Sequence, residues 1–393
     1  MSRSPSSKLS IGFFTEVYRP VVNGVVESVD TLAEGLRERG HSVYCFAPQM
    51  PGGNANERAV FRMPSLPLPT NTPYRLTLPL VSRRNVNNVI KRLSLVHVHS
   101  MFVTGWTGLR YARRYGMPVV YTYHTQLEAY THYVPFEPHA TRFAALQLTR
   151  TFGNLVDAVI VPTPAMARHL RDMGVETRIE IVPSGIDVER FGAGRRDDAL
   201  RARIGARRGD RVLLFVSRLA REKNAELLLR ALAETSDPKL KLVIAGDGPA
   251  RDELEMLADQ LGVAERTRFL GAVAREQLPD LYASADAFVF PSTTETQGLV
   301  QAEALASGAY VISADAPSNR EVLGAAGRIV EPTIAAFARA MEEVPGGPHA
   351  VAQSRARAAA ARFAVGHQVD RVLELYASLL APEPAGKTSR QTA

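Results

Sequence analysis

Short apolar segments alternate with helical segments along this chain, and the alternation runs through both halves. In the first half, five apolar segments have the length of strands: LSIGFF (9–14), HSVYCFAP (41–48), SLVHVHS (94–100), MPVVYTYH (117–124) and VDAVIVPT (156–163). The second half has five more: RVLLFVSRL (211–219), LKLVIAGDG (240–248), TRFLGAV (267–273), ADAFVFPST (285–293) and GAYVISAD (308–315). Strands that are apolar throughout need cover on both faces, as in parallel sheets between helical layers. The pattern predicts an α/β protein with two doubly wound domains.

The chain has 393 residues, which is enough for two domains of ordinary size. A Pro-Ser-Gly step within IVPSGIDVERF (181–191) interrupts the alternation. The last helical segment, 365–381, has no strand after it and leads into a polar tail. We therefore predict an N-terminal domain over 1–184, a C-terminal domain over 185–368, and a crossover helix with a disordered tail over 369–393.

The composition suits a protein of the reducing cytoplasm. The single cysteine, Cys45, lies in an apolar strand segment, so we expect a buried structural thiol and no internal disulfide. The first apolar stretch, 9–14, is too short for a signal sequence. No apolar run approaches the roughly 18 residues that span a bilayer. We expect a chain that is neither secreted by this route nor integral to a membrane.

The net charge of +7 is unevenly distributed. Residues 1–184 contain 20 Lys and Arg against 12 Asp and Glu, whereas residues 185–393 contain 27 against 28. The segment 58–127 holds ten basic residues and no acidic one. The positive electrostatic potential of such a basic segment attracts polyanions or an anionic membrane surface.

Several polar motifs follow predicted strands, where open α/β sheets bind ligands. Gly24 follows Asn23 at the predicted start of a helix, where backbone N–H groups favour phosphate. Arg218 and Lys223 flank the start of another helix, and two cations there suit a diphosphate. Gly246 belongs to a Gly-Asp-Gly turn that leads into a helix. Taken alone, the stretch at Asn23 and Gly24 is equally compatible with an ordinary strand-to-helix turn, and the stretch with Arg218 and Lys223 favours a solvated basic loop.

The segment PSTTETQGLVQAEALASG (291–308) carries two glutamates, Glu295 and Glu303, on either side of a helix start. Amides of Gly298, Leu299 and Val300 would face an incoming phosphate. A carboxylate on each side could accept hydrogen bonds from two sugars. The alternative is one capping and one surface glutamate.

Histidines also follow the strands of the first half. His124 comes after a strand and is expected at the edge of the cleft. His97 and His99 alternate along LVHVHS, and we expect them on opposite faces of a sheet as core residues. No Asp-x-Asp element at a strand end and no His/Cys cluster suggests a metal site.

Together these motifs resemble the retaining glycosyltransferase family 4, which has the GT-B architecture of two Rossmann-like domains facing a central cleft. The resemblance extends from FFTEVYRPVVNGVVESV through IVPSGIDVERF, VSRLAREKN and AGDGP to ETQGLVQAEALASG. It implies that the N-terminal domain binds the acceptor and the C-terminal domain binds the nucleotide sugar. It also implies that the final helix crosses back to the N-terminal domain.

The resemblance assigns a role to each candidate residue. His124, Arg218, Lys223 and Glu295 are implied as catalytic: the histidine and Glu295 near the donor sugar, and the cations on the diphosphate. The implied donor-binding residues are Gly24 near the phosphates, Glu303 on the ribose, Val273 on the base, and Gly246, Gln297, Gly298, Leu299 and Val300 around them. No metal or other cofactor is implied. Front-face displacement is the family's usual account of retention, and nothing in the sequence decides it.

The stretch YHTQLEAYTHYVP resembles the bacterial diacylglycerol glucosyltransferases and phosphatidylinositol mannosyltransferases of that family. The basic N-terminal half supports a lipid acceptor independently, because Arg83, Arg84, Lys91 and Arg92 lie among leucines and valines. A solvated helix packed by its apolar side is the alternative. We predict transfer of a hexose, with UDP-glucose favoured, to diacylglycerol by a peripheral enzyme on the inner face of the cell membrane.

Other functions stay open at this point. A GDP-mannose-dependent enzyme acting on phosphatidylinositol or another glycolipid is the second transferase hypothesis, and a transferase with a small soluble acceptor is the third. Nucleotide-sugar epimerases share the fold but lack this glutamate spacing. A basic nucleic-acid-binding protein would also have a pI near 9.6, but the cations are not interleaved with stacking aromatic residues. We therefore expect no nucleic-acid partner.

Overall fold

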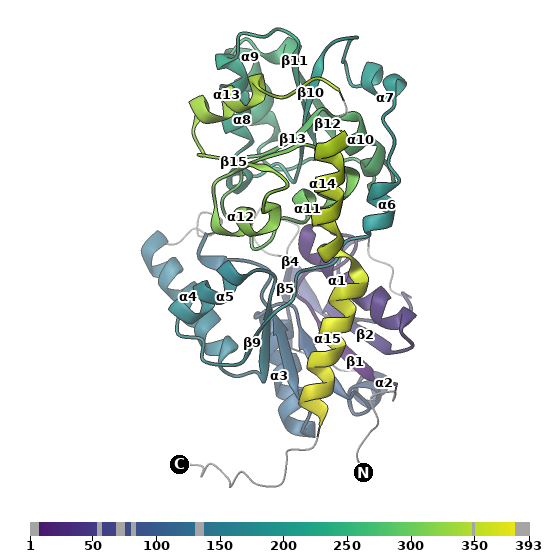
Figure 1. The fold of residues 1–393 in the computed structure, drawn as a ribbon. Coiled ribbons are helices and arrows are strands. Elements are labelled where there is room, and N and C mark those ends of the chain that lie inside the picture. The colour runs from purple at the N-terminus through teal and green to yellow at the C-terminus, as the bar shows by residue number, and fades with distance from the viewer. Residues whose placement is uncertain are drawn as a thin grey trace.

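The computed structural model describes residues 8–52, 57–67, 75–79, 84–129, 137–347 and 350–381. Two α/β domains stack one above the other, and a long C-terminal helix runs along the lower one (Figure 1). The predicted disordered tail lies outside the described residues.

The first domain contains a seven-stranded parallel sheet in the order β3-β2-β1-β6-β7-β8-β9. Its strands are β1 (Ser10–Phe14), β2 (Ser42–Pro48), β3 (Val60–Met63), β6 (Leu95–Val98), β7 (Val119–Thr122), β8 (Ala158–Val161) and β9 (Ile179–Ile181). An antiparallel pair, β4 (Ser65–Pro67) and β5 (Arg75–Thr77), stands apart from this sheet.

The second domain contains a six-stranded parallel sheet in the order β12-β11-β10-β13-β14-β15. Its strands are β10 (Arg211–Val216), β11 (Leu240–Ala245), β12 (Thr267–Gly271), β13 (Ala287–Phe290), β14 (Val311–Ala314) and β15 (Arg328–Val330). Each of the ten predicted strand segments contains a strand, so the predicted pair of doubly wound domains is confirmed.

Helices connect the strands and cover the sheets. The helices of the first domain are α1 (Gly24–Glu38), α2 (Arg84–Ile90), α3 (Val103–Tyr115), η1 (Leu127–Ala129), α4 (Pro138–Gly153) and α5 (Pro164–Asp172). Those after β9 are α6 (Val188–Gly192), α7 (Asp198–Arg203), η3 (Arg221–Lys223), α8 (Ala225–Glu234), α9 (Arg251–Gln260), η4 (Ala264–Arg266), η5 (Arg275–Gln277), α10 (Leu278–Ser284), α11 (Leu299–Ser307), α12 (Pro317–Leu323), α13 (Ile334–Glu342), α14 (Ala350–Ala360), η6 (Ala361–Phe363) and α15 (Val365–Leu380).

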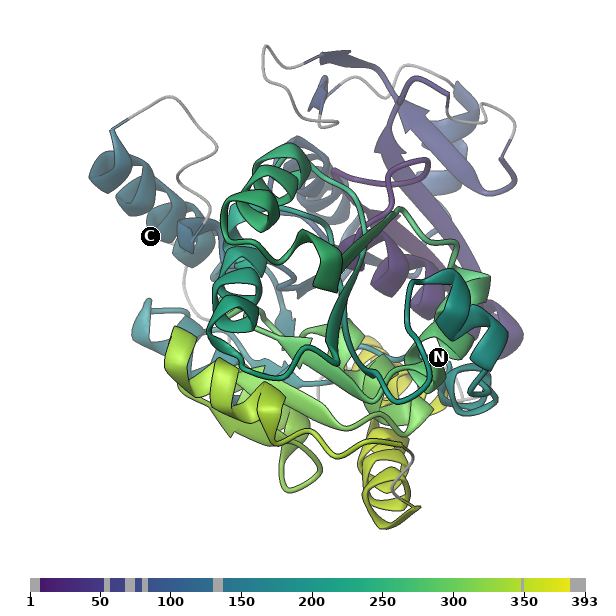
Figure 2. The same cartoon turned by 90° about the horizontal axis from the view of Figure 1, so that it is seen from above.

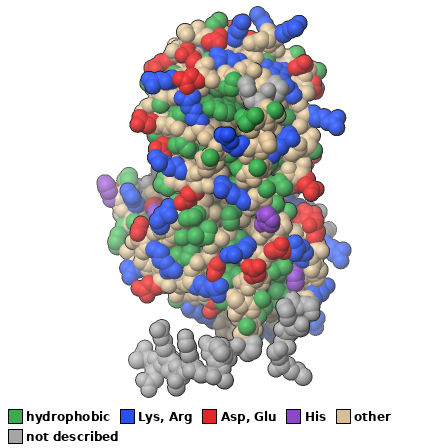
Figure 3. All heavy atoms as spheres, viewed as in Figure 1, with side chains coloured by type: hydrophobic (Ala, Val, Ile, Leu, Met, Phe, Trp, Pro, Cys, Tyr) green, Lys and Arg blue, Asp and Glu red, His purple; other side chains and the backbone are tan. Residues whose placement is uncertain are grey.

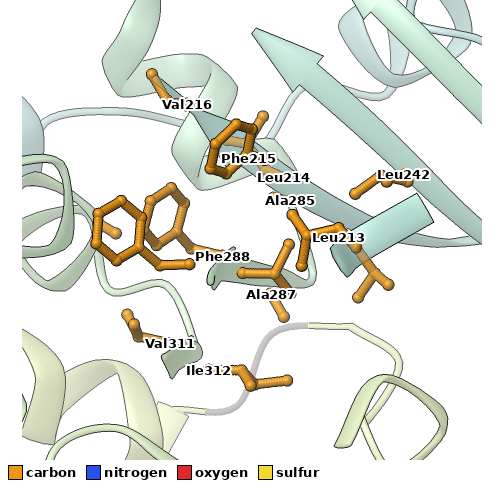
Figure 4. Close-up of a cluster of buried hydrophobic side chains, with 14 of the residues drawn as sticks. Leu213, Leu214, Phe215, Val216, Leu242, Ala285, Ala287, Phe288, Val311 and Ile312 are labelled. Carbon is orange, nitrogen blue, oxygen red and sulfur yellow. The ribbon is translucent and has the colours of Figure 1, made fainter. Parts of the chain in front are cut away.

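The buried apolar strands explain why both sheets are covered on two sides. In the second domain, consecutive residues of β10 all lie inside the core, together with residues of β13 and β14 (Figure 4). In the first domain, one core cluster joins the sheet to α1 and α15, and a second joins it to α3 and α5. The thiol of Cys45 belongs to the first of these clusters and is buried, as predicted.

Two chain segments cross between the domains and pair with each other. The amide of Ile186 donates to the carbonyl of Phe363 at 2.7 Å, and the amide of Val365 donates to the carbonyl of Ile186 at 3.1 Å. Beyond this crossing, α15 packs against α1, where only a glycine fits: a Cβ on Gly35 would lie 2.6 Å from Val369. The final helix therefore belongs to the core of the first domain.

Each sheet has one point where the strand order reverses. The chain builds β1, β2 and β3 towards one edge and then returns to place β6 beside β1. It likewise builds β10, β11 and β12 before placing β13 beside β10. Loops at such a reversal leave a crevice at the C-terminal ends of the strands, where α/β proteins bind ligands. The view from above shows the second domain lying over the first (Figure 2).

Candidate active site

The loops at the reversal of the second sheet bring predicted cations and a carboxylate together. Lys223, at the end of η3, donates to Oε1 of Glu295 at 2.5 Å. The hydroxyl of Ser292, which follows β13, donates to the same oxygen at 2.9 Å. Both charged side chains are mostly buried, with about one-sixth of their area exposed. Lys223 and Glu295, which the sequence analysis singled out separately, therefore form a single, partly desolvated ion pair.

Arg218 is held next to this unit. Its guanidinium pairs with the carboxylate of Glu222, whose backbone carbonyl accepts a hydrogen bond from Ser292 at 3.2 Å. Ser292 thus links the loop after β10 to the loop after β13.

The glycines after β11 allow the strand ends to approach closely. Gly246 has a φ of +144°, and a Cβ there would lie 1.8 Å from the carbonyl oxygen of Ser217. Gly248 has a φ of +157°, and a Cβ there would lie 2.3 Å from the carbonyl oxygen of Leu219. Backbone this close tolerates no side chain, so the two glycines fix the path of the loop that carries Arg218.

Glu303 lies on α11 and is buried. The hydroxyl of Tyr282 donates to its Oε2 at 3.2 Å, and a guanidinium nitrogen of Arg275 lies 3.7 Å from its Oε1. Burial raises the pKa of Glu303, and the charge of Arg275 opposes that rise. Arg275 also pairs with Glu27 of α1, so the carboxylate of Glu303 is connected to the first domain.

The starts of two helices meet across the domain boundary. Gly24 opens α1, and a Cβ there would lie 3.9 Å from Leu299, the first residue of α11. Gly298 precedes Leu299 with a φ of +79°, which allows the sharp turn into the helix. Val300 follows in the first turn of α11. The amides at both helix starts therefore face one region between the domains.

Gln297 does not point its side chain into this region. Its amide group binds the interdomain linker instead, accepting from the amide of Ser184 at 2.7 Å and donating to the carbonyl of Ser184 at 3.0 Å. Both polar atoms of the Gln297 side chain are therefore engaged by Ser184, and only the backbone of Gln297 is left to contact a ligand.

The first domain contributes His124, which follows β7 and lies against the loop of Glu295. The carbonyl of His124 accepts a hydrogen bond from the hydroxyl of Thr296 at 3.1 Å. Gln126 donates to the carbonyls of Thr294 and Glu295 at 3.1 and 3.3 Å. Burial lowers the pKa of His124 to about 4, so its ring is neutral at pH 7.

The prediction that His97 and His99 face opposite sides of the sheet was wrong. Their rings stack with centroids 4.2 Å apart. Side chains alternate along a strand, so residues two positions apart share a face. The prediction that both are buried is confirmed.

Some residues of the site were missed by sequence reasoning. Arg275 follows β12 shortly after Val273, a partly buried residue that packs on the domain core. Because Arg275 follows the end of a strand, the sequence could have identified it as a candidate site residue. Gln126 and Thr163 could not have been found, because their partners at 294–296 lie in the other domain.

The structure thus brings the Lys223–Glu295 pair together with the loops of Arg218 and His124, so that cations and helix N-termini able to hold an anion lie near carboxylates able to hold hydroxyls. Gly246 shapes the loop of Arg218, and Val273 packs on the core of the second domain. Within the described part of the chain, no group of three or more His, Cys, Asp or Glu could hold a metal ion. Nor does any described helix combine the length and hydropathy needed to cross a bilayer.

Comparison with known families decides what kind of site this is. The model of "Glycosyltransferase Family 4" matches residues 22–190, and that of "Glycosyl transferases group 1" matches residues 196–361. The chain belongs to glycosyltransferase family 4. Membership makes it a glycosyltransferase that takes its sugar from a nucleotide sugar, and it identifies the two stacked domains as the GT-B fold.

Curated relatives of this glycosyltransferase are similar over most of their length. An alpha-monoglucosyldiacylglycerol synthase of Streptococcus pneumoniae is 34% identical over 316 residues, which cover 78% of this chain and 71% of the relative. A GDP-mannose-dependent alpha-mannosyltransferase of Mycobacterium tuberculosis is 32% identical over 321 residues, covering 80% and 81%. The solved structure of Anabaena HepE with UDP and glucose shares the fold, with a TM-score of 0.75, 21% identity, and coverage of 94% of this chain and all of that one.

Proposed function

We propose that this glycosyltransferase moves glucose from UDP-glucose to a membrane lipid, with diacylglycerol as the acceptor. The observation that carries the transferase chemistry is the Lys223–Glu295 pair, which lies at the sheet reversal beside Arg218 and two helix starts. The choice of sugar and acceptor is supported by two relatives named alpha-monoglucosyldiacylglycerol synthase, each 34% identical.

In this proposal Arg218 and Lys223 neutralise the diphosphate as the bond to the sugar breaks. Amides of Gly24 and of Gly298 to Val300 add their dipoles to the same charge. Glu295 and His124 contact the donor sugar, and Glu303 holds the ribose hydroxyls beside Val273. Because the positive charge comes from side chains and helix ends, the proposed reaction requires no bound metal.

A screen of donors by thermal shift tests the donor assignment. UDP and UDP-glucose should raise the melting temperature more than GDP and GDP-mannose at equal concentration, because a ligand stabilises the folded state to which it binds. A larger shift with GDP-mannose would favour the alternative supported by the mannosyltransferase relatives, namely transfer of mannose to phosphatidylinositol or another glycolipid. Transfer to a small soluble acceptor stays the third hypothesis.

Replacing Glu303 with alanine should weaken UDP binding roughly 10- to 100-fold, because hydrogen bonds to a charged group contribute about 1.5–3 kcal/mol. Calorimetric titration with UDP measures the change. Glu276→Ala is the matched control, since this glutamate is in the same domain but most of its side chain is exposed. Equal affinity of the Glu303 variant and the wild type would contradict the ribose assignment.

The proposed location is the inner face of the cell membrane, reached through the basic first domain. Lys91 and Arg92 directly follow α2 and are exposed. Arg83 and the side chain of Arg84, predicted for the same surface, lie outside the described part of the structure. On the face that carries α15, basic and acidic side chains are interspersed over both domains (Figure 3), so that face is not the proposed membrane surface.

Reversing the charge at Lys91 and Arg92 to glutamate should lower binding to anionic vesicles by at least about 30-fold, since each cation near such a surface contributes roughly 1 kcal/mol. Sedimentation with phosphatidylglycerol vesicles measures this. The control reverses Arg207 and Arg208, two exposed cations of the second domain. Equal binding by both double variants, or no binding by the wild type, would overturn the membrane assignment.

A further inference from the structure

Three histidines form a connected group at the ends of β6 and β7, in which His97 and His99 are buried and His124 is partly exposed. Nδ1 of His99 and Nε2 of His124 are 3.0 Å apart, and the ring of His99 stacks on that of His97. His97 is fully engaged: its Nδ1 is 2.6 Å from the hydroxyl of Tyr376 on α15, and its Nε2 is 2.6 Å from the hydroxyl of Thr122. The side chain that the family resemblance places near the donor sugar therefore rests on a second imidazole.

All three rings are neutral near pH 7. Burial together with the neighbouring imidazole of His124 lowers the pKa of His97 to about 3. Burial lowers the pKa of His124 to about 4 and that of His99 well below its ordinary value. A neutral imidazole carries one proton, so one nitrogen donates and the other accepts. The positions of these protons decide what His124 can offer to a ligand.

The surroundings of His99 determine which of its two ring nitrogens carries the proton. Its Nε2 is buried and has no hydrogen-bond partner among the described residues. A proton on that nitrogen would leave a buried N–H donor unpaired, an arrangement that folded proteins rarely contain. The proton therefore belongs on Nδ1, which donates to Nε2 of His124. Since Nε2 of His124 accepts, the single proton of His124 is on its Nδ1.

We propose that His99 is a positioning residue that holds His124 in the Nδ1–H tautomer, so that His124 offers an N–H donor, and not a lone pair, to the sugar in the cleft. The part of this proposal that concerns the sugar rests on the proposed function. The ring of His99 packs against two other rings, that of Phe13 with centroids 4.6 Å apart and that of His97 with centroids 4.2 Å apart. This packing leaves the imidazole of His99 little freedom to turn.

Nitrogen-15 NMR of histidine-labelled protein tests the tautomer without any substrate. The chain has nine histidines, and the loss of one signal set in a His124→Gln variant assigns the residue. We expect His124 to show a protonated Nδ1 and an unprotonated, hydrogen-bonded Nε2. A protonated Nε2 on His124 would overturn the proposal, whatever the enzyme's donor or acceptor proves to be.

Kinetics of matched variants test the positioning role. His99→Leu removes the donor to His124, whereas His99→Asn keeps an N–H close to the position of Nδ1. Tyr376→Phe is the control, because it removes a hydrogen bond from the same group but from His97. We expect His99→Leu to lower kcat roughly 10- to 100-fold with little change in KM for the donor, as for a misplaced reacting group.

His99→Asn should recover most of that loss, and Tyr376→Phe should lower the melting temperature while leaving kcat nearly unchanged. Equal losses of kcat in His99→Leu and Tyr376→Phe at equal losses of stability would mean that the group is only structural. Equal kcat in the Leu and Asn variants would also contradict the proposal. Absence of any transfer from UDP-glucose would contradict the proposed function instead, and the NMR result would still decide the tautomer.

Discussion

Replacing Lys223 with alanine will lower the turnover of the enzyme roughly 100- to 1000-fold, which is the effect of removing one preorganised group that stabilises developing negative charge. The ammonium group lies at the reversal of the second sheet, with about one-sixth of its side chain exposed. There it is paired with Glu295 at 2.5 Å. In the proposed reaction, the charge of Lys223 would act on the leaving diphosphate with less screening than in water, because the site is partly desolvated.

Turnover at saturating donor is the quantity to measure, with UDP affinity measured separately. Arg230→Ala is the matched control, because it removes a cation from the neighbouring helix α8 whose exposed pair with Glu226 does not reach the cleft. The control should retain wild-type turnover. A Lys223 variant with turnover within about threefold of the wild type would mean that this cation does not stabilise the leaving group.

The sequence predicted the central strands well because their apolar character is a consequence of burial on both faces. β1, β10 and β13 lie in the middle of their sheets, and no polar residue interrupts the core face of β10 (Figure 4). The edge strands β3, β9 and β15 were missed. They are three or four residues long and partly exposed, and each contains a charged residue, so neither length nor periodicity marked them.

The candidate site residues that lie in tight loops directly after strands could be predicted from the sequence. Glu295 and Lys223 are 72 residues apart, yet both follow strands that the reversal makes neighbours. Contacts between the domains were not predictable, because they depend on how two separate sheets are stacked. The pair of Arg275 with Glu27 and the binding of Gln297 to Ser184 are of this kind.

Replacing Gly246 with alanine should lower the unfolding free energy of the second domain by roughly 2–6 kcal/mol, since overpacking and backbone strain each contribute about 1–3 kcal/mol. The added Cβ would lie 1.8 Å from the carbonyl oxygen of Ser217, and backbone cannot give way as a flexible side chain can. The φ of +144° is itself unfavourable for any residue with a Cβ.

Gly262→Ala separates these two causes. This glycine also has a positive φ, +69°, but a Cβ there would meet nothing within 4 Å. It should cost only the roughly 1–2 kcal/mol of the left-handed conformation. Denaturant unfolding of both variants measures the difference. If the two lose equal stability, close approach is not what requires glycine at position 246.

The Gly246 variant should also lose activity in the molecules that stay folded, and this distinguishes it from a substitution that affects stability alone. The carbonyl of Ser217 can avoid the new methyl group only if the loop after β10 moves, and Arg218 is the next residue of that loop. Turnover per folded molecule, measured well below the melting temperature, should therefore fall for Gly246→Ala and stay unchanged for Gly262→Ala. Unchanged turnover in the Gly246 variant would show that the position of Arg218 does not depend on the close approach of these two strand ends.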